Sequence, residues 1–585
     1  MKKLLHSHLR SIQEKGSKLI TEKENFLPAI SLMKAAGVIK RVRDKKKPFV
    51  TVINSYTNHI PGHCHLDALG RRLVERLKKK GFNVWYCNIG SAICDGIAMG
   101  HFGMRYSLPS RELIADQIES VICAHPPDGW IGIGNCDKIV PAMLNAMVRL
   151  NIPALYISGG PMLAGKENTD LISVFEGVGK YKRRKISKKE LTNLAETSCP
   201  GAGSCSGMFT ANTMNCLAEV LGFSLPGNGT ILAEKWVDKE KGITTLNPER
   251  IRLVEKAGDV IECLVKNKVR PLDILTRESI DNAFLADLAM GGSTNTILHL
   301  LALSFEAKIK YSLKRIGFLS KKTPTVCKVS PSRKEVHIED LHRAGGVPAI
   351  LKALSKYTRA PLSLEAKNVL GQGLKEWIEK APEPDGNIIR VGENVFFPTG
   401  GISILYGNLA PQGAVVKTAG VEKEMLCFKG RAVCFDKEEE ATRAIWEGKI
   451  KSGQIAVIRY EGPKGGPGMP EMLSPTSAIS GTKIKAALIT DGRFSGGTRG
   501  LAVGHISPEA AEGGPLAIVK NGDLMEIDVK KRKIDLLISQ KEFEKRFKSL
   551  KPFKLKVKGG WLRRYSEDVL SASFGAAMKD VVSPD

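Results

Sequence analysis

A thiol, a carboxylate and an amine stand side by side at residues 136–138. Cys136, Asp137 and Lys138 belong to the segment Gly-Asn-Cys-Asp-Lys, which lies between a predicted strand and a predicted helix. In parallel sheets, ligands gather at the loops that follow the strand C-termini. An ordinary turn accounts for the Asn and the Asp, but it explains neither the thiol nor the amine. The segment therefore predicts a functional site.

A second thiol, Cys205, lies in the small-residue segment Gly-Ala-Gly-Ser-Cys-Ser-Gly at 201–207, before a predicted helix at 208–221. Unpaired amides and the helix dipole favour the thiolate form of a cysteine at a helix N-terminus, and a thiolate is a metal ligand. Glycines let the backbone approach a bulky group closely. Small-residue loops also precede many ordinary helices, so a purely structural role for this segment remains the alternative.

Two further segments supply carboxylates. Asp95 lies in Cys-Asp-Gly-Ile-Ala-Met-Gly at 94–100, where it is equally well explained as a turn residue. Glu461 and Glu471 flank a run of glycines and prolines at 460–471, which predicts a shaped loop because that composition suits neither a helix nor a regular strand.

Ser495 follows a predicted strand at 486–489, in the segment Thr-Asp-Gly-Arg-Phe-Ser-Gly-Gly-Thr at 490–498. The flanking glycines and Arg493 favour an exposed, activated hydroxyl, although an ordinary turn fits equally well. The residue two before the serine is Arg493 rather than glycine, so the segment is not the nucleophile elbow of acyl-transfer hydrolases.

Ser293, Thr294 and Asn295 open a predicted helix that continues from residue 297. Free amides and hydroxyls at such an N-terminus form a site for an anion such as a substrate carboxylate. A simple helix cap is the alternative.

The elements that carry these residues predict an α/β protein. Strands are expected at 47–53, 82–87, 130–134 and 152–157, with helices at 66–80 and 141–150 among them. Such alternation predicts βαβ units and a mainly parallel sheet. From residue 386 the sequence becomes rich in Gly, Val and Ile, with β-prone runs at 388–391 and 454–458. We expect a basic lead-in at 1–35, an α/β domain at 36–385, and a β-rich, barrel-like domain at 386–585 with a closing helix at 561–580.

Composition restricts the class of protein. The chain has 585 residues, which favours more than one domain, and it has no apolar run of membrane-spanning length. The first residues include no apolar stretch followed by a small-residue cleavage site, so we do not expect a secretory leader. We therefore expect a cytoplasmic protein. Its 12 cysteines include no Cys-x-x-Cys pair, so disulfides and zinc knuckles are not expected. The formal charge of +27 raises a nucleic-acid alternative, but the basic runs are dispersed and have few interleaved aromatics. We expect neither a nucleic-acid nor a membrane partner.

Several long motifs resemble the dihydroxy-acid dehydratase and phosphogluconate dehydratase family. They occur in order at 107–116 (Ser-Leu-Pro-Ser-Arg-Glu-Leu-Ile-Ala-Asp), 134–138, 203–212, 290–296 and 491–498. Residues 406–410 (Tyr-Gly-Asn-Leu-Ala) and 504–511 (Gly-His-Ile-Ser-Pro-Glu-Ala-Ala) are similar to the dihydroxy-acid branch. The resemblance runs from about residue 48 to the C-terminus. It implies an α/β domain, a C-terminal β-barrel and a homodimer with its site between domains.

The resemblance also implies a reaction. A hydro-lyase of the dihydroxy-acid branch converts small 2,3-dihydroxy-3-methyl acids to 2-oxo acids in valine and isoleucine biosynthesis; a sugar-acid substrate, an aldonate or 6-phosphogluconate, is the alternative. Ser495 would be the general base.

The same resemblance implies two metal groups. Cys136 and Cys205 would hold an iron–sulfur cluster. The resemblance assigns Mg²⁺ to a set of four residues: Asp95, Asp137, Glu471 and Lys138. The lysine would carry a carbamate, since an ammonium cannot bind a cation and a carbamate supplies oxygen ligands.

The third cluster ligand departs from the pattern of many family members. Where those members have a cysteine, this sequence has Gly62, in Pro-Gly-His-Cys-His at 61–65. Cys64, Cys94 and Cys199 are the alternatives for the missing thiol, with Cys64 taken as the first candidate. The expected cluster is [2Fe-2S], with [4Fe-4S] as the alternative.

Overall fold

Four parallel strands form the sheet of the N-terminal half in the computed structural model, which describes residues 2–579 except 358, 483, 496, 497 and 499. The strands are β1 (Phe49–Asn54), β2 (Asn83–Asn88), β3 (Gly129–Gly134) and β4 (Ala154–Ser158). They lie in the order β2-β1-β3-β4, and all neighbours are parallel. The four strands predicted from the sequence are confirmed. Two glycines of the predicted serine loop, 496 and 497, lie outside the described residues.

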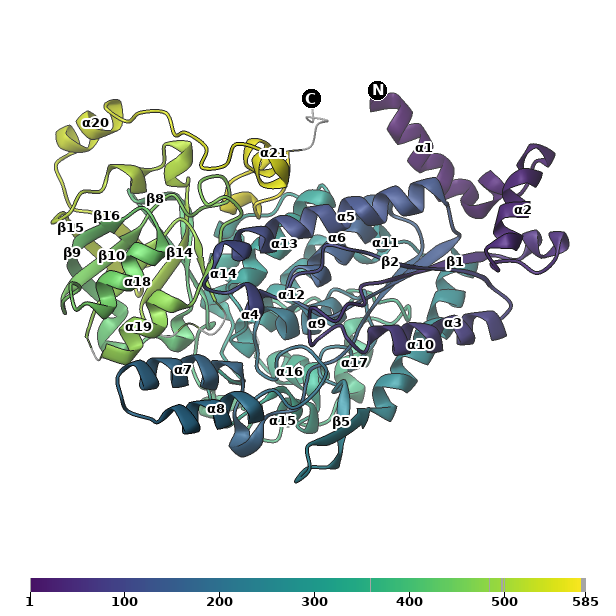
Figure 1. The fold of residues 1–585 in the computed structure, drawn as a ribbon, viewed down its shortest axis with the longest axis horizontal. Helices are drawn as coiled ribbons and strands as arrows, with labels where there is room; N and C mark the ends of the chain where they lie inside the picture. The colour runs from purple at the N-terminus through teal and green to yellow at the C-terminus, as the bar shows by residue number, and fades with distance from the viewer. Residues whose placement is uncertain (1, 358, 483, 496–497, 499, 580–585) are drawn as a thin grey trace.

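Helices cover both faces of this sheet (Figure 1). α3 (Leu66–Lys79) and α10 (Pro248–Asn267) pack on one face, and α5 (Ser107–Ala124) and α6 (Ile139–Leu150) pack on the other. β1 and β3 are buried at every residue, as expected of strands enclosed on both sides. Because the strands are parallel, the loops after them open at one edge of the sheet.

A further layer of helices packs around α9 (Thr210–Val220). It also contains α12 (Arg277–Met290), α13 (Asn295–Glu306) and α16 (Gly346–Ser355). α9 and α12 contact each other, and every residue of α9 is buried, as expected of a helix enclosed on all sides. The helices predicted at 208–221 and from residue 297 are confirmed.

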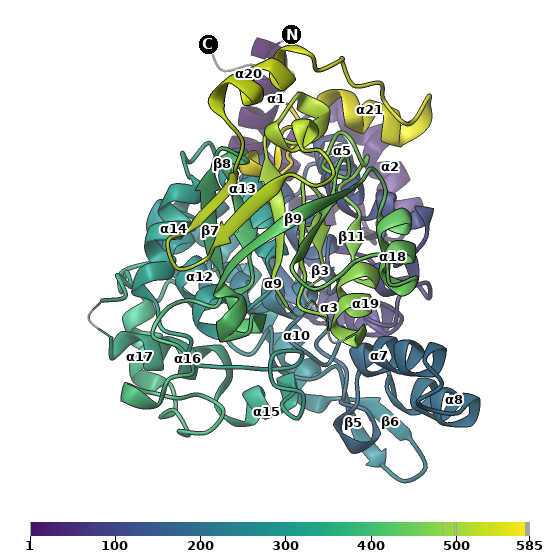
Figure 2. The ribbon, with the colours of Figure 1, turned by 90° about the vertical axis from the view of Figure 1, so that its left-hand side faces the viewer.

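The C-terminal half contains a closed barrel of eight strands in the order β10-β12-β14-β8-β7-β16-β15-β9. The strands are β7 (Ser403–Gly407), β8 (Ala410–Val416), β9 (Cys427–Phe435), β10 (Gln454–Ile458), β12 (Ala487–Thr490), β14 (Ala502–Ser507), β15 (Leu524–Asp528) and β16 (Lys533–Leu536). On β10, Ile455 and Val457 join one hydrophobic cluster, and Ala456 and Ile458 join a second one. The second cluster includes residues of α18 (Glu438–Trp446) and α19 (Ser474–Thr482), which lie side by side against the barrel (Figure 2). The predicted barrel-like fold of this half is confirmed.

Two local predictions in this half are wrong. The run at 388–391 is not a strand: Ile389 makes only an isolated bridge, to Cys327. The cause is Asp385, whose carboxylate accepts the backbone N–H groups of residues 387–389 and turns the chain. The closing helix α21 (Gly560–Asp568) is shorter than predicted. It is followed by a turn whose Gly575 packs so closely on α13 that a Cβ there would collide with the helix backbone.

The two halves are joined by direct contacts. α7 (Leu171–Lys182), from the N-terminal half, packs against α19, and the Lys182 ammonium lies 3.8 Å from the centroid of the Trp446 ring. The Arg105 guanidinium pairs with the buried Glu461 carboxylate at 2.8 Å.

The N-terminal lead-in forms α1 (Lys2–Lys15) and α2 (Leu27–Ala35), which lie at the end of the molecule farthest from the barrel (Figure 1). The Ser17 hydroxyl donates to Asp128 at 2.7 Å and attaches this segment to the sheet domain. None of the helices in the described ranges has the length and apolar character that a membrane crossing requires.

Candidate functional site

Side chains from both halves of the molecule meet at the C-terminal edge of the parallel sheet. Asp137 and Lys138 lie in the turn between β3 and α6, and Asp95 begins the short helix α4 (Asp95–Ala98) that follows β2. Glu471 comes from the other half, where β11 (Glu471–Met472) pairs with β13 (Arg493–Phe494). The site is therefore built at the junction of the two halves.

The three carboxylates Asp95, Asp137 and Glu471 form one compact group. Each offers an oxygen, and these oxygens all lie within 4.8 Å of one another. The Lys138 ammonium is buried among them, with its Nζ 2.5 Å from Asp95 Oδ2, 3.6 Å from Asp137 Oδ2 and 3.8 Å from Glu471 Oε2. A buried cation thus stands where three acidic side chains converge, which is the electrostatic arrangement that a metal ion requires.

The carboxylates do not share one protonation behaviour. Burial opposes ionisation of Asp95, but the charges of Lys138 and Arg493, together with hydrogen bonds from Lys138 and Ser107, outweigh it and lower the Asp95 pKa. Burial, together with the charges of Asp95 and Glu471, raises the pKa of Asp137 to about 7. Burial also raises the pKa of Glu471. The charges of Lys138 and Arg493 therefore do not offset burial at Asp137 and Glu471, and added positive charge favours the ionised forms of these two carboxylates.

Glu471 is held by side chains from three segments. Arg493 Nη1 donates to Glu471 Oε2 at 2.8 Å, and Asn295 Nδ2 donates to the same oxygen at 3.0 Å. A hydrogen bond from the Ser495 side chain also favours the ionised glutamate. The predicted base is thus brought next to the predicted metal ligands. The Ser495 backbone N–H is fixed by the carbonyl of Met472 at 2.9 Å.

Residues 293–295, which are predicted to bind a substrate anion, make contacts within the protein. Asn295 reaches the site through Glu471, whereas the Ser293 hydroxyl bonds the Thr210 hydroxyl at 2.9 Å and accepts from the Asn295 backbone N–H at 3.2 Å. Thr294 is the N-cap position of α13 and is half-buried. Ser293 is therefore engaged within the protein, and Asn295 acts on a carboxylate ligand candidate.

The thiols Cys136 and Cys205 are brought together with Cys94. All three are half-buried. Burial raises the Cys136 pKa well above its usual value, and Cys94 and Cys205 raise it further. The Cys205 pKa is likewise raised by burial and by Cys94. The three sulfurs therefore lie within electrostatic range of one another, beside the carboxylate group.

Cys64 does not belong to this group of thiols. It is exposed, and its Sγ donates to the Pro61 carbonyl at 3.2 Å. After burial, its main electrostatic neighbour is Glu234. Gly62, in contrast, faces Cys136 directly, because a Cβ at that glycine would collide with Cys136 Sγ and lie 3.3 Å from the backbone N of Ser204.

His63 is a positioning residue that sequence reasoning missed. The buried ring donates from Nδ1 to the Ser55 carbonyl at 2.7 Å and accepts the Cys136 backbone N–H at Nε2, at 3.0 Å. Burial lowers the pKa of His63 to about 4, so the ring is neutral at pH 7. Its place between Gly62 and Cys64 was the only signal in the sequence. Ser107, whose hydroxyl donates to Asp95 Oδ1 at 2.6 Å, was also missed, although it begins one of the family-like motifs.

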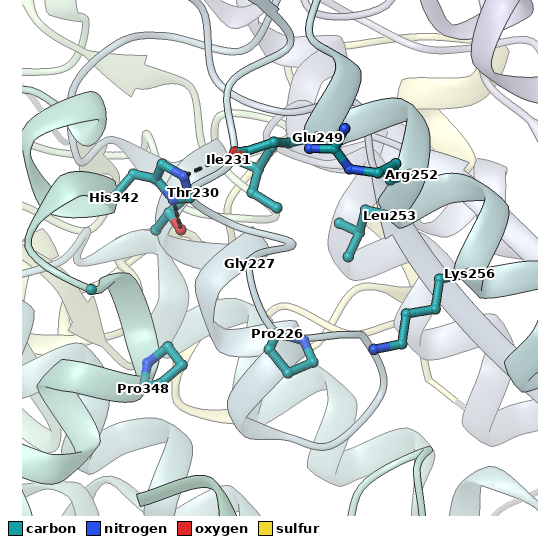
Figure 3. Close-up of a pocket in the computed structure, with 11 residues that line it drawn as sticks. Pro226, Gly227, Thr230, Ile231, Glu249, Arg252, Leu253, Lys256, His342 and Pro348 are labelled. Carbon is teal, nitrogen blue, oxygen red and sulfur yellow. Dashed lines mark hydrogen bonds and ion pairs between the residues drawn. The ribbon is translucent and has the colours of Figure 1, made fainter. Parts of the chain in front are cut away.

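Two cavities lie outside the carboxylate group. A surface cavity of about 480 Å³ is lined by residues of α10 and by His342 (Figure 3). Its labelled side chains include Glu249 and Lys256, and none of the predicted site residues lines it. A smaller cavity of about 330 Å³ lies at the junction of the halves, where its lining includes Arg105 and Pro470, the residue before Glu471. The smaller cavity therefore adjoins the site, and the larger one does not.

Comparison with known proteins gives matches over almost the whole chain. The family model for the N-terminal domain of dihydroxy-acid/6-phosphogluconate dehydratases matches residues 47–377, and the model for the C-terminal domain matches residues 387–576. The chain is 55% identical over 562 residues to the dihydroxy-acid dehydratase of Aquifex aeolicus (strain VF5), with 94% of this chain and 97% of that relative covered. It is 51% identical over 568 residues to the dihydroxy-acid dehydratase of Hydrogenobaculum sp. (strain Y04AAS1), with 96% and 99% covered.

Proposed function

Since the chain belongs to the dihydroxy-acid/6-phosphogluconate dehydratase family, we propose that it removes water from 2,3-dihydroxy-3-methyl acids and yields 2-oxo acids, as valine and isoleucine biosynthesis requires. Both relatives described above are named dihydroxy-acid dehydratases, which favours this branch over aldonate or 6-phosphogluconate substrates. The observation that carries the mechanism is the meeting of Ser495 with carboxylates from both halves of the molecule.

The carboxylate group fits Mg²⁺. Hard oxygen donors are the ligands that this ion prefers, and Asp95, Asp137 and Glu471 offer them from one compact group. As part of the proposal, Lys138 carries a carbamate, which replaces its ammonium by a fourth source of oxygen. The short approach of Lys138 to Asp95, at 2.5 Å, supports this assignment because it puts the lysine nitrogen among the other ligands.

The thiols fit an iron–sulfur cluster, for which Cys136 and Cys205 are the first two ligands. Thiolates are the protein ligands of such clusters. We expect a [2Fe-2S] cluster, with [4Fe-4S] as the alternative. When bound, the two metal groups supply Lewis acidity, one toward the substrate carboxylate and 2-hydroxyl and the other toward the departing 3-hydroxyl.

The chain's own residues then perform the proton transfer. Ser495 Oγ, ionised, takes the proton from C2 of the substrate, and the bond from C3 to its hydroxyl breaks. The hydroxide leaves as water when it takes up the proton that Ser495 gained, which restores the ionised serine. The resulting enol loses its hydroxyl proton and gains a proton at C3, which gives the 2-oxo acid. A serine is a poor base at its ordinary pKa, so its ionised form depends on nearby positive charge. Arg493 supplies part of that charge, because its guanidinium is buried and pairs with the same glutamate that Ser495 contacts.

The proposal is tested with anaerobically reconstituted protein in the presence of Mg²⁺. We expect conversion of 2,3-dihydroxy-3-methylbutanoate to 2-oxo-3-methylbutanoate, and a much lower rate with an aldonate. Ser495→Ala should lower kcat by roughly 10²–10⁴-fold, the usual contribution of a general base, without changing the visible spectrum of the cluster. Ser549→Ala, at an exposed serine of the same half, is the matched control. Absence of turnover in cluster-loaded, Mg²⁺-saturated protein would refute the function, and full activity of Ser495→Ala would refute the base.

A homodimer is also part of the proposal. Size-exclusion chromatography with light scattering tests it, because the expected mass is twice the 63.7 kDa of one chain. A monomer of full activity would refute the dimer and leave the reaction unaffected.

A further inference from the structure

The thiols of Cys94, Cys136 and Cys205 lie beside the carboxylate group. Cys136 and Cys205 are the two assigned cluster ligands, and they make up only part of a cluster's ligand set. Cys94 immediately precedes Asp95, whose Oδ2 lies 2.5 Å from the Nζ of Lys138. Lys138 in turn follows Cys136 by two residues in the same turn. The loop that begins α4 is therefore fixed against the loop that carries Cys136, and Cys94 is placed next to it.

Electrostatic interactions among the sulfurs support this placement. Besides burial, Cys94 is the leading influence that raises the pKa of Cys136, and it also raises that of Cys205. Cys199 is an exposed thiol that interacts with Cys205 and Cys94, but it is not among the main influences on Cys136. Of the three alternatives for the missing ligand, Cys64 and Cys199 are exposed, whereas Cys94 is half-buried in the loop that Asp95 and Lys138 fix against Cys136.

The position of the cysteine found in other family members is closed in this chain. Gly62 occupies it, and a Cβ there would collide with Cys136 Sγ. Cys64, two residues later, donates its thiol to the Pro61 carbonyl on the exposed side of the loop. In the segment at 61–65, the residue that faces Cys136 is therefore a glycine without a side chain, and the thiol of Cys64 is bonded elsewhere.

The surroundings of Cys94 suit a bound thiolate. Burial raises the pKa of Cys94, and the backbone N–H groups of Ile97 and Gly96 oppose that rise. A Cβ at Gly96 would lie 3.8 Å from the sulfur, so the loop leaves ordinary van der Waals space around it.

From this arrangement we propose that Cys94 is the third thiolate ligand of the iron–sulfur cluster and that it takes the place of the cysteine replaced by Gly62. The inference rests on the proposed function, because that function implies the cluster. Cys94, Cys136 and Cys205 would then hold the cluster, which would supply Lewis acidity toward the departing hydroxyl.

The first experiment measures cluster binding rather than activity. Wild type, Cys94→Ala, Cys199→Ala and Cys263→Ala are reconstituted anaerobically and desalted, and bound iron, acid-labile sulfide, visible absorption and the EPR spectrum of the reduced protein are recorded. Cys263 is an exposed thiol on α10 and serves as the matched control. We expect Cys94→Ala to retain iron roughly tenfold or more weakly than wild type, at least the effect of losing an outer partner of a metal site. Far-UV circular dichroism of the cluster-free proteins checks that every variant is folded.

The second experiment needs no variant. Wild type is alkylated before and after cluster loading, and the modified cysteines are identified by mass spectrometry. We expect the cluster to protect Cys94, Cys136 and Cys205, and to leave Cys64 and Cys199 open to alkylation.

The outcomes separate this inference from the function on which it rests. If wild type binds a cluster but Cys94→Ala keeps the same iron content and spectrum, or Cys94 stays alkylated after loading, the third ligand lies elsewhere and the proposed function stands. Loss of the cluster in Cys199→Ala alone would also overturn the inference. If wild type binds no cluster, the proposed function itself fails.

Discussion

Protonation of His63 should loosen the loop that carries Cys136. The ring is buried and neutral, with Nδ1–H bonded to the Ser55 carbonyl and Nε2 accepting the Cys136 N–H. A proton on Nε2 would remove that acceptor and put a charge in an apolar place. Since the folded pKa of about 4 lies below the unfolded value of 6.5, the unfolded chain binds the proton more readily. Stability is therefore full above pH 6.5 and is lost as the pH falls toward 4.

The size of this loss follows from the two pKa values. Each tenfold difference in proton affinity corresponds to about 1.4 kcal/mol, so the displacement of the His63 pKa from 6.5 to about 4 costs about 3 kcal/mol once protonation is complete. About 2 kcal/mol of that loss falls between pH 7.5 and pH 5.0, because the folded ring is still largely neutral at pH 5.0.

Urea unfolding of the cluster-free protein at these two pH values measures the effect. Tryptophan fluorescence is a suitable probe, since the Trp130 side chain is buried in β3. Other groups titrate as well, so wild type is compared with His63→Gln, which lacks the titrating ring, and with His59→Gln, at an exposed histidine of the same segment. We expect the pH-dependent loss to be smaller by about 2 kcal/mol in His63→Gln only. An equal pH dependence in all three proteins would refute the reasoning.

Three further substitutions test separate contacts. Arg105→Ala should lower the free energy of unfolding by about 3 kcal/mol, because it leaves the buried Glu461 carboxylate without its 2.8 Å partner; an unchanged thermal transition would contradict this. Asn295→Ala should weaken Mg²⁺ binding roughly tenfold, since Glu471 loses a 3.0 Å hydrogen bond, and calorimetric titration that finds wild-type affinity would contradict it. Gly62→Ala should weaken iron retention roughly tenfold by displacing the neighbouring cysteine thiol, which iron analysis after desalting checks against wild type.

Local patterns in the sequence were enough to predict the four strands of the parallel sheet and several of the helices around it. Apolar runs such as that of β3 predict a strand because both faces of a parallel sheet are buried. Burial of both faces requires apolar residues at successive positions, and such a run is visible in the sequence itself. The motif around Cys136 was recognised for a similar reason: an unusual set of reactive groups occurs within one short turn. The run at 388–391 misled the same reasoning, because its apolar residues pack a turn that the Asp385 carboxylate fixes.

Only the tertiary structure decided which residues share the site. Asp95, Asp137 and Glu471 come from three separate segments in two different halves, and no local pattern predicts that their oxygens lie within 4.8 Å of one another. Likewise, the spacing of the cysteines did not distinguish Cys64 from Cys94. The sequence specifies each loop through short-range hydrogen bonds and turns, whereas the distance between loops depends on how the sheet, the helical layer and the barrel pack together. That packing is a sum of many contacts between residues far apart in the chain.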